Sequence, residues 1–180
     1  MDTLENKKYK YVKNMLSSDL VDYLSSFSLK NFKVTNDPQY PMAYSIHSSK
    51  SQIYHHILHF LKDTMEKETN LKLKPTYCYN RIYLPGSDLE KHTDRFACEI
   101  SASITLKYFY KDKDYKWPLC MNNIPIVIES GDGVIYKGCE IEHWRPVFIQ
   151  PKECWHHQLF IHYVDLNGPY ADEKEEETKK

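Results

Sequence analysis

The sequence lacks any long apolar stretch. No segment approaches the ~20 apolar residues of a membrane-spanning helix, and the opening residues, MDTLENKKYKYVKN, lack the apolar centre of a signal peptide. We therefore expect a cytoplasmic protein without a membrane span. The chain also lacks an excess of charge, since its formal net charge is −1. This balance argues against nucleic acid as a partner, and the only candidate basic patch is the lysine cluster at residues 7–13.

The chain has few cysteines, and their spacing does not suggest disulfide or metal-binding pairs. The five cysteines are odd in number, widely spread and without a C-x-x-C pair. This argues against a disulfide scaffold or a structural zinc site and predicts buried thiols. Histidine and tyrosine are abundant by contrast, with nine and fifteen copies. Because histidine is the most common metal ligand, the surplus makes a metal site worth seeking without establishing one.

The patterns along the chain predict one domain with a helical beginning and a β-rich remainder. Residues 1–70 show helical spacing, with Ser17-Ser18-Asp19 as the cap of a first helix and a second helix expected over 49–68. From residue 71 onward, period-two alternation and turn residues take over, and all five glycines lie beyond residue 85. The expected strands are 72–84, 88–92, 97–110, 115–119, 125–129, 133–137, 141–149 and 155–165.

About eight short strands preceded by helices predict a mainly β protein of the double-stranded β-helix kind, a cupin-like jelly roll with helices packed outside. We divide the chain into a helical support of the same domain at 1–70 and a jelly-roll core at 71–168. The charged tail at 169–180 has no apolar periodicity, and we expect it to be disordered.

Three residues in this β-rich region form a candidate metal site. His92 and Asp94 are two residues apart, so on a strand their side chains point to the same side. His143 lies on a later predicted strand, after the turn Gly131-Asp132-Gly133. Two imidazoles and one carboxylate on adjacent strands make the facial triad of non-haem iron, although zinc bound by the same ligands is chemically possible.

The residues around these ligands resemble the 2-oxoglutarate- and Fe(II)-dependent oxygenases over roughly residues 77–165. The segment Tyr83 to Asp94 reads Tyr-x-Pro-Gly-x-x-Leu-x-x-His-x-Asp. This is similar to the entry of the first ligand strand in prolyl-4-hydroxylase-like and AlkB-like members. The segments Gly131 to Tyr136 and Glu142 to Arg145 are similar to the strand pair that carries the distal histidine. The chain looks most like the small single-domain hydroxylase-like proteins of bacteria and their viruses.

This resemblance implies an enzyme that holds Fe(II) with His92, Asp94 and His143, uses 2-oxoglutarate and O₂, and hydroxylates a C–H bond. The implied substrate is a prolyl residue, another peptide side chain or a free amino acid. Two alternatives remain: an AlkB-type oxidative dealkylase of nucleic acid, against which the balanced charge argues, and a non-catalytic jelly-roll binding module, against which the three ligands argue. The sequence gives no indication of oligomeric state.

The resemblance further implies a cation for the distal carboxylate of 2-oxoglutarate, because a buried unpaired carboxylate is costly. Many members supply an Arg or Lys about ten residues after the distal histidine. Here the region Pro151 to Gln158 contains no arginine, and Lys152 is expected in a solvated loop. We favour Tyr83 with Arg145, then His162. The full set of candidates is Tyr83, Arg81, Arg145, Gln158 and His162.

Two further groups are interpreted as structural. His55 and His59 lie four residues apart on the second predicted helix, but no carboxylate joins them in a recognised pattern. We interpret them as ordinary surface or groove histidines. Arg95 is expected to face away from the triad and either to contact substrate or to pair with Glu99.

Overall fold

The computed structural model describes residues 4–31, 36–37, 40–47 and 51–176. In chain order the elements are α1 (Leu4–Lys7), β1 (Tyr9–Val12), α2 (Ser18–Lys30), β2 (Asn36–Asp37), β3 (Tyr40–His47), α3 (Gln52–Phe60), α4 (Lys62–Thr69), β4 (Leu73–Tyr83), β5 (Leu89–His92), the 3₁₀ helix η2 (Phe96–Cys98), β6 (Ile100–Phe109), β7 (Leu119–Met121), β8 (Ile124–Ile126), β9 (Gly133–Lys137), β10 (His143–Arg145) and β11 (Trp155–Asp165).

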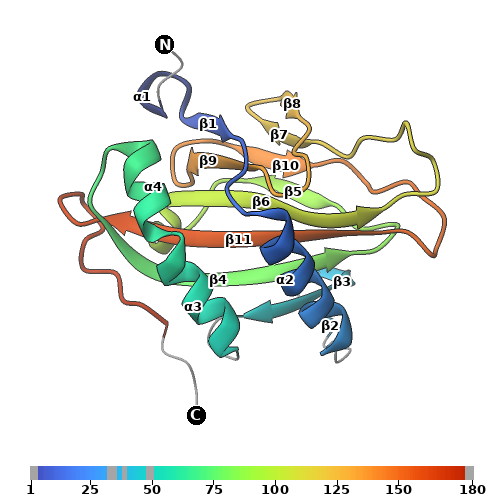
Figure 1. The fold of residues 1–180 in the computed structure, drawn as a ribbon. Helices are drawn as coiled ribbons and strands as arrows, with labels where there is room; N and C mark the ends of the chain where they lie inside the picture. Colours follow the sequence, from blue (N-terminus) through green and yellow to red (C-terminus); the bar gives the residue numbers. More distant parts are fainter. Residues whose placement is uncertain (1–3, 32–35, 38–39, 48–50, 177–180) are drawn as a thin grey trace.

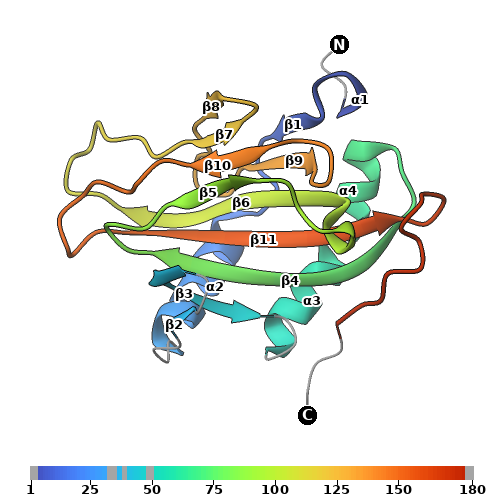
Figure 2. The ribbon, with the colours of Figure 1, turned by 180° about the vertical axis from the view of Figure 1, so that it is seen from behind.

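The strands form two antiparallel sheets (Figure 1). The larger has seven strands in the order β1-β9-β6-β11-β4-β3-β2, and the smaller has four in the order β5-β10-β7-β8. Helices α2, α3 and α4 lie across one face of the larger sheet, and Figure 2 shows β5 and β10 on its opposite side. We call the helix-covered side the outer face and the side toward the smaller sheet the inner face.

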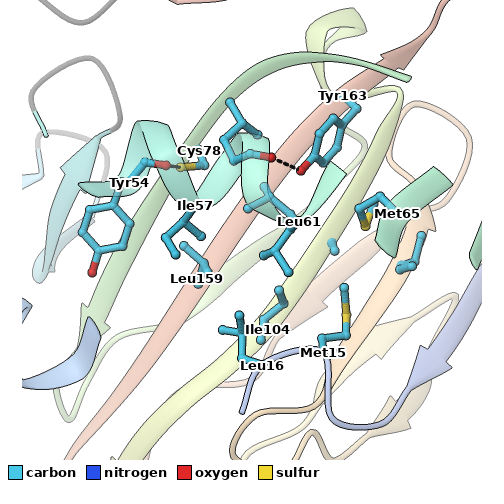
Figure 3. Packing of buried hydrophobic residues seen from close by; sticks show 14 of the residues in the cluster. Met15, Leu16, Tyr54, Ile57, Leu61, Met65, Cys78, Ile104, Leu159 and Tyr163 are labelled. Atoms are coloured by element: carbon cyan, nitrogen blue, oxygen red, sulfur yellow. Dashed lines mark hydrogen bonds between the residues drawn. The ribbon is translucent and has the colours of Figure 1, made fainter. Parts of the chain in front are cut away.

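Apolar residues fill the space between the outer face and the helices (Figure 3). Leu159 and Tyr163 of β11 pack there with Leu61 and Met65, and all four are at most 1% exposed. The Tyr163 hydroxyl donates a hydrogen bond of 2.6 Å to the carbonyl oxygen of Leu58. Strand and helix are thus joined by apolar packing and by a satisfied polar group, which fixes α3 on the sheet.

The predicted elements from residue 72 onward agree closely with the structure for the long strands. β4, β9 and β11 coincide with the predicted ranges to within a residue. The range 115–119 is mostly loop, with β7 only beginning at Leu119, and 141–149 contains a strand of three residues. Ser17 accepts a hydrogen bond from the Leu20 amide and caps α2 as predicted, while the second predicted helix divides at Leu61.

The helical interpretation of residues 1–70 is incomplete. β1 pairs with β9 at one edge of the larger sheet, with Tyr11 opposite Val134, and β3 pairs with β4 near the other edge. Local spacing did not reveal these strands, because strand formation depends strongly on the neighbouring strand with which a segment pairs. The first 47 residues therefore supply both edges of the sheet as well as helices.

The segment 166–176, most of which was expected to be disordered, lies along the body of the protein. Tyr170 stacks on Phe96 with ring centroids 4.5 Å apart. The Glu176 amide donates to the carbonyl oxygen of Thr76 at 2.7 Å. These contacts explain the difference from the composition-based prediction, since they join residues that are far apart in sequence. Residues 177–180 lie outside the described residues.

All five cysteines are thiols, and four of them are buried, as the sequence predicted.

Within the described residues, no helix combines the length and the apolar character needed to cross a lipid bilayer.

Candidate metal centre

A tight turn between β4 and β5 carries the chain from the larger to the smaller sheet. The Ser87 amide donates to the carbonyl oxygen of Leu84 at 2.9 Å, and Gly86 has a φ of +95°. Proline followed by a residue with positive φ is the signature of a type II turn, which explains Pro85-Gly86 in the sequence. The Gly86 amide also donates to the carbonyl oxygen of Phe148 at 2.9 Å, so the turn is tied to the loop after β10.

The strand register brings the two histidines together. β5 and β10 are antiparallel neighbours, and His92 lies directly opposite His143. Asp94 follows β5, and its amide donates to the carbonyl oxygen of Gly138 at 2.9 Å. A Cβ atom on Gly138 would lie 2.5 Å from Asp94 Oδ2 and 2.2 Å from the carbonyl oxygen of Cys98. Glycine at this position therefore makes room for the carboxylate.

The ligand atoms of His92, Asp94 and His143 all lie within 4.8 Å of one another. Asp94 Oδ1 is 3.4 Å from His92 Nε2 and 3.6 Å from His143 Nε2. Each Nδ1 faces a backbone carbonyl oxygen, that of Glu90 at 2.7 Å and that of Ile141 at 3.1 Å. An Nδ1–H that donates to these oxygens leaves each Nε2 unprotonated, which is the tautomer that binds a metal.

The electrostatics of the three groups reflect their burial and their proximity. Burial on its own would raise the pKa of Asp94, but the His92 hydrogen bond and the nearby imidazoles outweigh it and lower that pKa. A protonated His92 can donate from Nε2 to Asp94, and this raises the pKa of His92, so an ion that binds there must displace that proton. Burial lowers the pKa of His143. Asp94 is therefore a carboxylate at neutral pH and His143 is neutral, as metal ligands must be.

The arrangement fits a divalent ion. Donors that share one ion through bonds of ~2.1 Å at right angles are about 3 Å apart, and the observed separations are a few tenths of an ångström larger. Three ligands on one side of the ion leave the remaining positions open, which is the geometry of the facial triad. The donor set by itself does not distinguish iron from zinc.

Arg145 is a buried cation close to this site. It is 2% exposed, and its Nη1 donates to the carbonyl oxygen of Trp117 at 3.0 Å. Its guanidinium carbon lies 4.6 Å from the centroid of the Trp117 ring. Among the described residues, its Nε and Nη2 atoms have no hydrogen-bond partner. Because arginine keeps its proton even when burial lowers its pKa, these two donors point to an anionic ligand.

Two more predicted residues connect Arg145 with the triad. Tyr83 is fully buried, and its hydroxyl accepts a hydrogen bond of 3.3 Å from Arg81 Nη1. Arg81 is close enough to His92 for its charge to lower the pKa of that histidine. Tyr83 in turn is close enough to Arg145 to favour its charged form. The Tyr83 ring also packs against Trp117 with centroids 4.9 Å apart, and Trp117 in turn lies against Arg145, so Arg81, Tyr83 and Arg145 belong to one group of contacts.

The other two predicted residues, His162 and Gln158, both lie on the inner-face side of β11. His162 Nδ1 is 2.7 Å from Ser101 Oγ, and His162 groups with Asp94 rather than with Arg145. The amide of Gln158 is engaged within the protein: its Nε2 donates to Ser103 Oγ at 2.9 Å, and its Oε1 accepts from His156 Nε2 at 2.8 Å. The structure therefore brings Tyr83, Arg81 and Arg145 together. Gln158 lies directly opposite Arg81 on the neighbouring strand but has its amide engaged elsewhere, and His162 lies with Asp94.

Several residues of the site were not singled out from the sequence. Tyr136 packs against His143 with ring centroids 4.8 Å apart, and Ser101 lies 3.5 Å from Asp94 Oδ2. The period-two alternation of β9 and β6 could have identified Tyr136 and Ser101, because both side chains point to the inner face. Trp117 follows no alternation because it lies in the loop before β7, so only the tertiary structure reveals it.

Arg95 has a different partner from the one expected. It lies 4.5 Å from the centroid of the Tyr77 ring and forms an ion pair of 3.0 Å with Glu176. Glu99 instead accepts a hydrogen bond from the Asp165 amide. The chain leaves the strand at Asp94 and turns into η2, so strict alternation no longer applies to Arg95.

Comparisons with known proteins identify the fold. No protein-family model matches the sequence, and no curated protein sequence matches it. Solved structures do match. A Pseudomonas putida prolyl-4-hydroxylase has a TM-score of 0.67 and 18% identity, covering 90% of this chain and 95% of that chain. HygX from Streptomyces hygroscopicus, with nickel, 2-oxoglutarate and hygromycin B bound, has a TM-score of 0.69 and 13% identity, covering 91% and 85%.

A third match is the viral collagen prolyl hydroxylase vCPH from Paramecium Bursaria Chlorella virus-1, in complex with 2OG. Its TM-score is 0.63 and its identity 13%, covering 88% of this chain and 98% of that chain. At identities this low, the likeness concerns the backbone. It confirms the predicted jelly-roll fold, mainly β with helices outside, which this chain shares with solved structures of prolyl hydroxylases and HygX.

Proposed function

We propose that this protein is an Fe(II)- and 2-oxoglutarate-dependent oxygenase that hydroxylates a C–H bond. The observation that carries the proposal is the meeting of His92, Asp94 and His143 beside a buried guanidinium that has two unpaired donors. A metal triad alone suits several kinds of chemistry. A metal triad next to an arginine without a carboxylate partner suits a co-substrate that both chelates the ion and carries a second carboxylate.

In this proposal the three ligands hold Fe(II). At this position an iron ion would let O₂ be reduced while 2-oxoglutarate is oxidised to succinate and CO₂, which would provide the oxidising power for a substrate C–H bond. The protein contributes the geometry. The carbonyl oxygens of Glu90 and Ile141 hold both imidazoles in one tautomer, and Gly138 leaves space for Asp94.

Arg145 with Tyr83 anchors the distal carboxylate of 2-oxoglutarate in this proposal. The carboxylate would accept hydrogen bonds from Arg145 Nε and Nη2, which gives a bidentate pair in a buried setting. The cation comes from β10 rather than from the start of β11, where His156 and Gln158 bond to each other. The buried ring of Trp117 shields the guanidinium from water and so strengthens the pair.

For the substrate we propose a prolyl residue, another peptide side chain or an amino acid. Aromatic rings continue from the triad along β4: Tyr79 stacks on Phe160 with centroids 4.7 Å apart, and Tyr77 lies 4.5 Å from the His162 ring. Flat rings of this kind suit a small cyclic or apolar group that must lie close to the ion. Two of the matched structures are prolyl hydroxylases, and a third was solved with hygromycin B bound.

The lysine cluster near the N-terminus does not favour the nucleic-acid alternative. Lys8 forms an ion pair with Glu140. Lys10 forms one of 2.8 Å with Glu68. Paired lysines offer little to a phosphate backbone, which requires several uncompensated cations. The AlkB-like reading of the entry motif and the cytoplasmic location stay predictions.

The test is conversion of 2-oxoglutarate to succinate by the purified full-length chain with Fe(II) under air. We expect slow turnover without substrate, and His143→Ala should reduce it at least 100-fold, because the ion loses a ligand. His56→Ala, at an exposed helix position, is the matched control and should retain full turnover. Absence of both turnover and anaerobic Fe(II) binding in the wild type would refute the oxygenase.

Substrate class is tested separately with the active enzyme. Mass spectrometry of proline-containing peptides and free amino acids should show an added oxygen atom that depends on 2-oxoglutarate. Salt-sensitive binding of nucleic acid together with loss of a methyl group from an alkylated oligonucleotide would instead establish the dealkylase. Succinate formation without any modified product in either assay would leave the proposed hydroxylation of these substrates unsupported and point to another substrate class.

A further inference from the structure

A second cluster of possible ligands joins helix α3 to the segment 166–176. His55 and His59 are four residues apart on α3, so both imidazoles project from the same face of the helix. Their ring centroids are 4.9 Å apart. The segment 166–176 brings a carboxylate to them: Glu175 Oε1 is 2.7 Å from His59 Nε2 and 3.5 Å from His55 Nδ1. The carboxylate that the sequence pattern lacked is therefore supplied from a distant part of the chain.

The three side chains are accessible yet partly enclosed. Their side-chain exposures are 28% for His55, 45% for His59 and 29% for Glu175. The His55 Nδ1 atom itself is buried and has no hydrogen-bond partner among the described residues. A single proton shared by His59 and Glu175 leaves this buried nitrogen unsatisfied. A cation among the three donor atoms would satisfy all of them at once.

We propose that His55, His59 and Glu175 bind a divalent ion of the zinc class, at a site separate from His92, Asp94 and His143. Two imidazoles and one carboxylate form a donor set that zinc accepts, with a fourth position open to water. Donors around a tetrahedral zinc ion are about 3.4 Å apart, and the observed contacts of 2.7 and 3.5 Å lie on either side of that value. Histidines at i and i+4 of a helix are a geometry that zinc sites use.

Such an ion would fasten the segment 166–176 to α3. The next residue, Glu176, forms the ion pair with Arg95, which directly follows the ligand Asp94. The same segment holds Tyr170 on Phe96 in η2. The site therefore has a structural consequence: metal binding on α3 should stabilise the position of a segment that ends beside the first metal centre.

The decisive experiment measures zinc stoichiometry by isothermal titration calorimetry in a His143→Ala background, which disables the first site. We expect one equivalent of Zn²⁺ to bind in this background. The additional change His59→Ala should abolish that binding. The additional change His56→Ala should leave it intact, since the exposed His56 is not part of the cluster. Because the background lacks the first site, a failure of the oxygenase proposal does not affect the result.

A second variant separates metal binding from helix stability. Glu175 lies outside α3, so Glu175→Gln should not change the far-ultraviolet circular dichroism spectrum. It should weaken zinc binding at least tenfold. Hydrogen exchange should show that Zn²⁺ slows exchange of residues 169–176 in the His143→Ala protein but not in the Glu175→Gln double variant. Failure of the His143→Ala protein to bind zinc, or equal zinc affinity with and without Glu175→Gln, would overturn the proposal.

Discussion

The two faces of the larger sheet are both buried, but they differ in their share of polar side chains. Along β11, Leu159, Ile161 and Tyr163 point to the outer face and join the apolar core under the helices. His156 and His162 point to the inner face, and every one of these side chains is at most 2% exposed. Burial alone therefore does not mark the core. The inner face accumulates polar groups that cost free energy unless they are paired, which is the expected signature of a site rather than of a scaffold.

The buried polar side chains of the inner face differ in whether their hydrogen-bonding groups have partners. Gln158 uses both ends of its amide within the protein, and His156 is held between Gln158 and Tyr110. Arg145 instead keeps two donors without a partner in the described residues. The satisfied polar residues hold neighbouring strands together, whereas the unpaired donors of Arg145 are where we propose that the co-substrate binds.

The largest expected effect is a loss of stability when the apolar layer on the outer face is disrupted. Leu159→Ala should lower the free energy of unfolding by about 2–5 kcal/mol, because it leaves a cavity in the closely packed layer under the helices. Iron binding per folded molecule should be unchanged. The measurement is urea denaturation followed by circular dichroism, with Ile149→Ala as the control, since Ile149 is 74% exposed. A loss at Leu159 no larger than at Ile149 would contradict the assignment of this face as the core.

A smaller effect is expected on the inner face, where a substitution should reduce ligand affinity rather than stability. Arg145→Met should weaken 2-oxoglutarate binding about 100-fold or more, which corresponds to about 2.7 kcal/mol, because two charge-assisted hydrogen bonds are lost. The free energy of unfolding without co-substrate should stay within about 1 kcal/mol or rise, since an unpaired buried charge is removed. Tryptophan fluorescence of the Mn²⁺-loaded protein reports binding, because Trp117 lies against Arg145.

Lys152→Met is the matched control for this prediction. Lys152 is the exposed cation that precedes β11, near the position where the resemblance places the anchor. Its removal should leave the affinity for 2-oxoglutarate unchanged. A strong loss of affinity at Lys152 and none at Arg145 would move the anchor to the loop and reverse the conclusion about β10.

The smallest effect concerns a polar residue on the outer face. His157 is fully buried between Ser25 and Asn80, and burial lowers its pKa to about 3. In the unfolded chain its pKa is near the ordinary value of about 6.5, so the unfolded state takes up a proton first as the pH falls. The stability that neutral His157 contributes is thus present above about pH 6.5 and is lost progressively down to about pH 3.

Between about pH 7.5 and about pH 5.5 this residue should account for about 1.4 kcal/mol of lost stability. His157→Gln cannot take up this proton, so its free energy of unfolding should fall by that much less over the same interval. Urea denaturation at the two pH values measures the difference. Equal pH dependence in the two proteins would show that His157 is protonated in the folded state, contrary to its burial.

Much of this fold and its site follows from local sequence features. Alternation and turn residues predict β4, β9 and β11, and they place His92, Asp94 and His143 on or next to strands with the correct side chains on one side. Pro85-Gly86 predicts the turn that delivers the first ligand strand. These features are readable because each depends on neighbours a few residues away, through side-chain direction or backbone conformation.

The tertiary structure alone decided the rest. β1 and β3 pair with β9 and β4, and this pairing rather than their own residue pattern makes them strands. The unpaired donors of Arg145 and the shielding by Trp117 depend on which groups from distant loops come near. Glu175 reaches His55 and His59 only because the segment 166–176 folds back on α3. Contacts between residues far apart in sequence carry no periodic signal, so they emerge only once the chain is folded.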